Sequence, residues 1–275
     1  MNTSGLWALV TGASSGIGWQ FSELLAAKGC NIIAVSNQST RLESLKRHLE
    51  QSHAVQVVTI SQDLAREDAA QSLFAICQDQ KLTVDILVNN AGMLMFGEMV
   101  DSEYDTMRSI LQLHVTTPAL LCRLFGKVMK EKRSGYILNV SSISAVMPYP
   151  TISTYGPTKA FLRYFTRAIR TELKPYGVHV SCMIPGATDT PLNNPFEASL
   201  DFWRKIGIVK EAAFVARAGI RAMFRNRALC IPGVINKLII LLFPLIPAFL
   251  ISMVNMHRIR KVKNSKGRKH RPHPV

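Results

Sequence analysis

The stretch that decides the fold is residues 11–18, which read TGASSGIG. It follows a short apolar run at 6–10 and precedes residues 20–29, whose apolar positions recur at helical spacing. Three glycines permit a tight turn, a close approach of the backbone to a pyrophosphate, and close packing of the next helix, whose N-terminus faces the anion. Residues 11–18 therefore predict either a dinucleotide-binding turn or simply a tight connection between a strand and a helix.

Outward from this turn, apolar runs alternate with amphipathic stretches. Further strands are expected at 31–35, 55–60, 85–88, 136–140 and 178–184. Helices are expected at 40–51, 66–80 and 102–132, and from Tyr155 onward. Continuous apolar strands between amphipathic helices predict an α/β protein whose doubly wound parallel sheet is covered on both faces, with a helical and hydrophobic C-terminal extension.

Composition narrows the class of protein. A chain of 275 residues that is 48% hydrophobic favours one large α/β domain. Its five cysteines are widely spaced and contain no C-x-x-C, which disfavours a disulfide framework and a zinc site, so no metal is expected. The N-terminus lacks the features of a secretory signal. We therefore expect a cytoplasmic protein, either free or bound at the cytoplasmic face of a membrane.

The net charge of +15 is unevenly distributed. Residues 257–275 hold eight of the lysines and arginines and no acid, so +7 remains for residues 1–256. The preceding stretch, 238–256, is apolar and uncharged, but Pro244 and Pro247 disfavour a plain transmembrane helix. A surface-embedded or re-entrant segment next to a basic tail indicates an anionic membrane surface rather than nucleic acid. The alternative is that this stretch packs on the protein's own core or on a neighbouring subunit.

A second informative stretch is YGPTK, which places Tyr155 and Lys159 four residues apart. Residues at this spacing share one face of a helix, and Pro157 is tolerated in a first helical turn. An ammonium beside a phenol lowers its pKa and suits it to proton transfer near neutral pH. By itself the spacing is common, so it gains meaning only from the other motifs.

Together these motifs resemble those of the classical short-chain dehydrogenases/reductases. TGASSGIG resembles the family's cofactor turn, Asn89-Asn90-Ala91-Gly92 its N-N-A-G, and PGATDT at 185–190 the stretch that closes over the nicotinamide. Ser142 precedes Tyr155 by 13 residues, which is within the family's spacing. The resemblance spans about residues 5–192 and implies a Rossmann sheet, typically of seven parallel strands.

The resemblance also implies a set of cofactor-binding residues: Gly12, Ser14, Ser15, Gly16, Ile17, Gly18, Asn37, Arg41, Asp63, Asn90, Ala91, Gly92, Tyr155, Lys159, Pro185, Gly186, Thr188 and Thr190. No acid occupies Ser36-Asn37 at the end of the second strand, which favours NADPH over NADH. Arg41 either supplies charge for the 2′-phosphate or is a solvated helix residue. Asp63 either faces the adenine or forms a turn.

By the same resemblance, the catalytic residues are Ser142, Tyr155 and Lys159. Tyr155 would be the acid/base, Lys159 would lower its pKa and hold the nicotinamide ribose, and Ser142 would bind the substrate oxygen. Ser141 is the rival to Ser142. His114 stands where the family has an asparagine. It has either a supporting role, proton relay included, or a structural one, or it marks weakened activity.

The chain is expected to comprise a catalytic domain (1–234, with the substrate region at about 191–234), a hydrophobic segment (235–256) and a basic tail (257–275). The substrate region mixes aromatic and basic residues, so it forms either an apolar lining with a basic rim or an ordinary packed helix face. We expect an NADP(H)-dependent reductase of a hydrophobic ketone, 3-oxoacyl thioesters being favoured. The alternatives are a hydroxysteroid-type dehydrogenase and a cofactor-binding regulator, and a homo-oligomer is expected.

Overall fold

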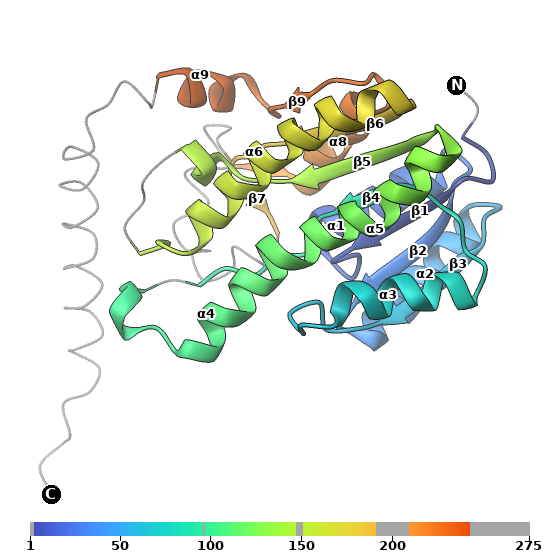
Figure 1. Cartoon of the computed structure of the whole chain (residues 1–275), viewed down its shortest axis with the longest axis horizontal. Helices are drawn as coiled ribbons and strands as arrows, with labels where there is room; N and C mark the ends of the chain where they lie inside the picture. The colour runs from blue at the N-terminus through green and yellow to red at the C-terminus, as the bar shows by residue number, and fades with distance from the viewer. Residues whose placement is uncertain (1–2, 96, 147–150, 191–208, 243–275) are drawn as a thin grey trace, which may run out of the picture.

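The computed structural model describes residues 3–95, 97–146, 151–190 and 209–242 (Figure 1). The expectations placed on residues 191–208 and 243–275, including most of the hydrophobic segment and the whole basic tail, lie outside these described residues. Within them the chain alternates strand and helix from the N-terminus to residue 183, as the sequence predicts.

A seven-stranded parallel sheet has the order β3-β2-β1-β4-β5-β6-β9. Its strands are β1 (Trp7–Thr11), β2 (Asn31–Ser36), β3 (Val57–Ser61), β4 (Val84–Asn89), β5 (Gly135–Val140), β6 (Val178–Met183) and β9 (Leu229–Cys230). A separate parallel pair joins β7 (Thr188–Asp189) to β8 (Lys210–Glu211). The doubly wound parallel sheet is thereby confirmed, and β9 is a seventh strand that periodicity did not indicate.

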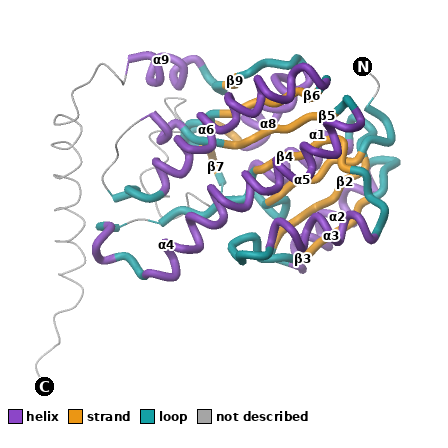
Figure 2. Tube along the Cα trace, in the orientation of Figure 1, coloured by secondary structure: helices purple, strands orange, loops and turns teal. Residues whose placement is uncertain are grey.

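Helices cover both faces of the sheet (Figures 1 and 2). They are α1 (Gly16–Ala26), α2 (Ser39–Ser52), α3 (Ala69–Asp79), α4 (Tyr104–Leu111), α5 (Thr117–Lys132), α6 (Tyr155–Leu173), α8 (Ala212–Phe224) and α9 (Val234–Leu242). Successive strand residues point to opposite faces, so Ala8 and Val10 pack with α1, α2 and α8, whereas Leu9 packs with α3 and α5. Two apolar cores therefore hold the sheet between two helical layers.

The long central helix is interrupted. The sequence predicts one helix over 102–132, but a short 3-10 turn, η1 (Met99–Asp101), precedes α4, and a π-helical turn, η2 (Gln112–Thr116), separates α4 from α5. Pro118 explains the interruption, because in a regular α-helix its ring would clash with the carbonyl of His114, four residues earlier. The widened turn relieves that clash and places His114 in the π-helical segment, a location frequent at functional sites.

Helix α8 settles one alternative for the part of the substrate region that is described. Val215, Ile220 and Met223 are buried in the first core, while Arg217 and Arg221 are exposed on the opposite face. Residues 212–224 therefore form a packed amphipathic helix, not an apolar lining with a basic rim. Across residues 3–242, gaps excepted, no helix is both long and apolar enough to cross a membrane.

Close packing of α8 predicts the effect of Gly219→Val. A Cβ atom at Gly219 would lie 2.7 Å from Sδ of Met183 and 3.1 Å from Cε1 of Phe21, and both neighbours are buried. Although valine has the better helix propensity, overpacking should lower the free energy of unfolding by about 1–3 kcal/mol in chemical denaturation. The control Arg217→Val, on the exposed face, should change it far less; equal losses in the two variants would contradict the packing account.

Candidate active site

All sequence-predicted site residues come from segments that lie at the carboxyl edge of the sheet. In a parallel sheet, the turns after its strands meet at one edge, where ligands of open α/β sheets bind. The turn at 11–18 follows β1, Asp63 follows β3, and residues 90–92 follow β4. Ser142 follows β5, and Pro185 follows β6. The topology thus gathers motifs separated by more than 170 residues.

Glycine is required in the turn after β1. Gly12 and Gly16 adopt φ values of +67° and +55°, which disfavour other residues. A Cβ atom on Gly18 would lie 2.0 Å from the carbonyl oxygen of Gly12. Helix α1 begins at Gly16, and Ser15 precedes it without a side-chain cap, so the first amides of α1 remain available to an anion. This turn fits the pyrophosphate of a dinucleotide.

Thr11, which sequence reasoning missed, ties that turn to the N-N-A-G motif. Its hydroxyl donates to the Val88 carbonyl (3.2 Å) and accepts the amides of Asn90 (2.9 Å) and Ala91 (3.0 Å). The side-chain amide of Asn90 donates in return to the carbonyl of Thr11 at 2.9 Å. The ends of β1 and β4 are therefore fixed to each other, and the signal was a threonine immediately before the first glycine.

The residues at the end of β2 include no acid that would repel a ribose phosphate. Ser36 donates to the hydroxyl of Ser14 at 2.8 Å, and both side chains are buried. Beyond Ser36, Asn37 and Arg41 are exposed, and no acid occurs between positions 36 and 41. The geometry therefore leaves Arg41 free to approach a phosphate, which satisfies one requirement of the predicted role.

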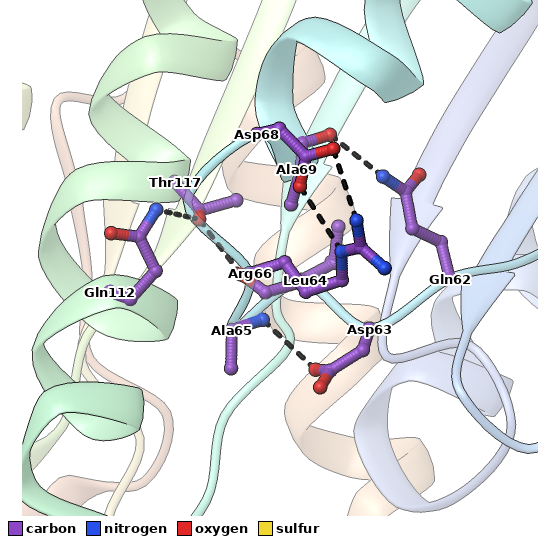
Figure 3. A network of polar contacts seen from close by, with 9 residues as sticks. All are labelled: Gln62, Asp63, Leu64, Ala65, Arg66, Asp68, Ala69, Gln112 and Thr117. Carbon is purple, nitrogen blue, oxygen red and sulfur yellow. Dashed lines mark hydrogen bonds and ion pairs between the residues drawn. The ribbon is translucent and has the colours of Figure 1, made fainter. Parts of the chain in front are cut away.

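The loop after β3 is held against the central helix (Figure 3). Asp63 Oδ1 accepts the amide of Ala65 at 3.0 Å, which is the turn-forming role considered for it. Thr117 donates to the carbonyl of Leu64 at 2.8 Å and accepts Nε2 of Gln112 at 3.2 Å. The Asp63 side chain nevertheless stays exposed, so the turn leaves it accessible to an adenine.

Two adjacent serines have different surroundings. Ser141 is 2% exposed, and its hydroxyl donates to the carbonyl of Lys159 at 2.7 Å. Ser142 accepts the amide (3.2 Å) and the hydroxyl (2.9 Å) of Ser144, and it lies near enough to the phenol of Tyr155 to counter part of the rise in its pKa. Only Ser142 thus combines partial exposure with contact to the tyrosine, so the geometry favours it over Ser141 as the substrate-facing hydroxyl.

Helix α6 places Lys159 beneath Tyr155. The ammonium of Lys159 is buried, donates to the carbonyl of Val140 at 3.2 Å and lies 5.6 Å from the centroid of the phenol ring. Burial lowers the pKa of Lys159 to about 8. Burial also raises the pKa of Tyr155, and the nearby Ser142 hydroxyl offsets only part of that rise. In the protein alone the pKa of the phenol is therefore raised, not lowered as expected, because burial disfavours the phenolate.

His114 is held as a neutral imidazole. Thr158 uses its single hydroxyl proton on the carbonyl of Tyr155 (2.7 Å), so at 3.1 Å it must accept a proton from Nδ1 of His114. Nε2 accepts the amide of Met93 at 3.0 Å. Burial and the charge of Lys159 lower the pKa of His114 well below its usual value. A proton relay through this ring would require one of these bonds to break.

The segment after β6 packs against the start of α9. The amide of Ile143 donates to the carbonyl of Pro185 at 2.9 Å, which joins this segment to the loop of Ser142. A Cβ atom at Gly186 would lie 2.4 Å from Oδ1 of Asn236, which is 2% exposed. Thr188 donates to the carbonyl of Gly186 at 3.0 Å, and Thr190 lies two residues further on. The segment with the predicted nicotinamide contacts thus packs against the first turn of α9.

The buried ammonium predicts a pH dependence of stability. Lys159 titrates near pH 8 in the folded chain and near its usual value of 10.5 when unfolded. Between these values the unfolded chain binds more protons, so this residue makes the free energy of unfolding rise with pH, by about 3 kcal/mol across the window. Buried thiols such as Cys122, whose pKa is raised, oppose this rise in the same window, so the test is the difference between proteins. Denaturation should show that the free energy of unfolding of the wild type increases with pH relative to that of Lys159→Met, but not relative to that of Lys127→Met, which removes an exposed ammonium on α5. Parallel curves for wild type and Lys159→Met would disprove the shift.

Comparison with known proteins agrees with this geometry. A family model described as short chain dehydrogenase matches residues 6–201. The chain is 30% identical over 207 residues to the 17-beta-hydroxysteroid dehydrogenase type 3 of Mus musculus, covering 73% of this chain and 67% of that protein. It is 30% identical over 202 residues to the very-long-chain 3-oxoacyl-CoA reductase of Rattus norvegicus, covering 72% of this chain and 64% of the relative.

A solved short-chain dehydrogenase from Sphingobium yanoikuyae, in complex with NADPH, superposes with a TM-score of 0.76 at 28% identity, covering 83% of this chain and 88% of that one. The matched regions span between 54% and 67% of the length of the curated relatives compared. Because the family model matches most of the sequence and the predicted site residues gather at the family's ligand edge, the chain belongs to the short-chain dehydrogenase family.

Proposed function

We propose that the protein is an NADP(H)-dependent oxidoreductase that interconverts a ketone and a secondary alcohol on a hydrophobic, lipid-like substrate, with 3-oxoacyl thioesters favoured. The observation that carries this proposal is the contact of Ser142 with Tyr155 directly above the buried ammonium of Lys159. The names of relatives that reduce very-long-chain 3-oxoacyl-CoA support the substrate class.

The three side chains divide the work on the substrate oxygen. Ser142, whose hydroxyl proton is not used by Ser144, donates to the carbonyl oxygen of the ketone. Tyr155 carries a proton that it can give to that oxygen in the reductive direction, and burial raises the pKa of this phenol further. The ammonium of Lys159 stabilises the phenolate that results. When bound, the reduced nicotinamide supplies the hydride.

The preference for NADPH rests on the end of β2. With no acid at positions 36–41, nothing there repels a 2′-phosphate, and the exposed guanidinium of Arg41 would supply a charge-assisted hydrogen bond to it. The cofactor would lie across the turn at 11–18, past the residues 90–92, and reach Tyr155 and Lys159 beneath the segment 185–190. Asp63 would contact the adenine from the loop after β3.

We propose that His114 is a positioning residue. Its ring joins the Met93 amide, in the loop after β4, to Thr158 on α6, and Thr158 in turn holds the carbonyl of Tyr155. The neutral imidazole also lies edge-on to the phenol, with ring centroids 5.5 Å apart. The orientation of α6 beneath the substrate therefore depends on a ring that both accepts and donates.

The organisation of the whole chain follows the same lines. We propose a catalytic domain at 1–234, a hydrophobic segment at 235–256 that associates with a membrane, and a basic tail at 257–275 that contacts its anionic lipids. A peripheral position at the cytoplasmic face suits the sign of the tail. We also propose that the protein forms a homo-oligomer, and we propose no binding to nucleic acid.

Two rival functions deserve separate tests. Relatives named 17-beta-hydroxysteroid dehydrogenase favour a polycyclic secondary alcohol or ketone as substrate. The replacement of the family's asparagine by His114 is the feature that favours a cofactor-binding regulator with little turnover. The side-chain bonds of the imidazole weaken this second rival, since they preserve a donor and an acceptor at that position.

The first activity prediction concerns Tyr155→Phe. Initial rates of NADPH and NADH oxidation, measured with 3-oxoacyl thioesters, ketolipids and ketosteroids, should show turnover with NADPH that falls by about 10²–10⁴-fold in the variant. Cofactor binding, followed by the fluorescence of NADPH, should persist. Unchanged turnover would overturn the role of Tyr155, and bound cofactor without turnover in either protein would favour the regulator.

The second prediction separates positioning from proton relay at His114. An asparagine can also accept the Met93 amide and donate to Thr158, so His114→Asn should keep kcat within a few-fold and leave the pH-rate profile unchanged. His114→Leu leaves both partners unsatisfied, at a cost of about 1–3 kcal/mol, and should lower both kcat and stability. A pH limb that disappears in His114→Asn would instead identify the ring as a proton carrier.

A further inference from the structure

Two exposed apolar elements lie on either side of the candidate site. Across the sheet the strands follow the order β4-β5-β6-β9, and the site residues Ser142 and Pro185 leave β5 and β6. The chain that leaves β4 forms η1 and the start of α4, and the chain that leaves β9 forms α9. In Figure 1 both α4 and α9 lie toward the left of the molecule.

Helix α9 presents an unusually apolar surface. Five large apolar side chains are at least 37% exposed: Val234 (71%), Ile235 (37%), Leu238 (51%), Leu241 (70%) and Leu242 (53%). The helix is nonetheless anchored to the rest of the protein. Asn236 is buried against Gly186 and donates to the carbonyl of Pro232 at 2.7 Å. In addition, α9 contacts the turn η3 (Ile143–Val146), which follows Ser142. The exposed face of α9 therefore has a defined position beside the site.

The other side of the site has a smaller surface of the same kind. Met99 and Val100 in η1 are 52% and 84% exposed, and Tyr104 at the start of α4 is 76% exposed. The amide of Gly97 donates to the carbonyl of Thr151 at 2.9 Å, so the loop before η1 is joined to the loop that leads into Tyr155. Exposed apolar residues this close together mark an interaction surface.

We propose that these two surfaces rest on an anionic lipid bilayer, so that the candidate site opens toward the membrane and takes its substrate from it. The chain after α9 argues for this occupant: residues 238–256 are uncharged, and residues 257–275 then supply eight cations and no acid. Apolar residues followed by cations match acyl chains beneath anionic headgroups. A symmetric dimer through α9 would instead bring two such tails together, at a cost in like-charge repulsion.

The inference rests on the proposed function in one respect, the lipid-like substrate. For a water-soluble substrate, the position of α9 beside the site would have no consequence. For a long-chain 3-oxoacyl thioester, entry from the bilayer keeps the apolar chain out of water. Exposing that chain to water would cost about 0.8 kcal/mol of transfer free energy per CH₂ group. Membrane binding and turnover can therefore be measured separately.

The test uses the full-length chain and the paired substitution Leu238→Asp/Leu241→Asp. In co-sedimentation with vesicles of phosphatidylcholine and phosphatidylserine, the paired variant should bind about tenfold or more weakly than wild type. Val100→Asp should also bind more weakly than wild type, but the loss should be smaller. The control is Tyr164→Asp, an equally exposed position on α6 at 64%, which should bind like wild type. Vesicles of phosphatidylcholine alone should bind the wild type more weakly than the anionic vesicles.

Turnover distinguishes this inference from the proposed function. The paired variant should keep its rate with a short, water-soluble 3-oxoacyl thioester and lose it with a long-chain one presented in vesicles. Equal vesicle binding by the paired variant and Tyr164→Asp overturns the inference, as does a change of oligomeric state in place of lost vesicle binding. If the wild type turned over neither substrate, the proposed reductase activity would be rejected, but the vesicle-binding result would still test the membrane surface.

Discussion

The geometry of the site depends on the close packing of Gly18 against the carbonyl of Gly12, which leaves no space for a side chain at position 18. Because Gly18 packs onto the Gly12 carbonyl, α1 begins directly behind the turn, and the amide of Asn90 closes the other side of it. Thr11 then fixes the loop after β4, and that loop supplies the Met93 amide to His114. One constraint at the end of β1 is thus transmitted to the residues that surround the phenol of Tyr155.

The chemical groups at the far end of this chain of contacts are tuned by burial. Lys159 is held by a strand carbonyl, its own helix is held by Ser141, and its pKa drops because water is excluded. The same exclusion raises the pKa of Tyr155. A protonated phenol above a lysine that is still charged at neutral pH is an arrangement suited to giving a proton to a carbonyl oxygen, which agrees with a reductase.

The motifs were predictable from sequence because each is required by the local backbone conformation or packing, as at Gly12 and Gly18, or by a fixed helical spacing, as between Tyr155 and Lys159. What escaped prediction depends on contacts between distant segments. The tautomer of His114 is set by an amide 21 residues away, the direction of the Tyr155 pKa by burial, and β9 by pairing with β6 rather than by its own sequence. The π-helical turn did leave a signal, Pro118, that the periodicity of the helix concealed.

The central claim is that the protein reduces a ketone with NADPH at the site on the carboxyl edge of its sheet. Following the transferred hydride tests it most directly. Full-length protein would be incubated with a 3-oxoacyl thioester and NADPH that carries deuterium at both C4 positions of the nicotinamide, and the product analysed by mass spectrometry for wild type and Ser142→Ala. The account predicts a 3-hydroxyacyl product with deuterium on the carbinol carbon, formed far more slowly by Ser142→Ala although its affinity for NADPH is unchanged. A product without deuterium, or equal rates for the two proteins, would contradict it.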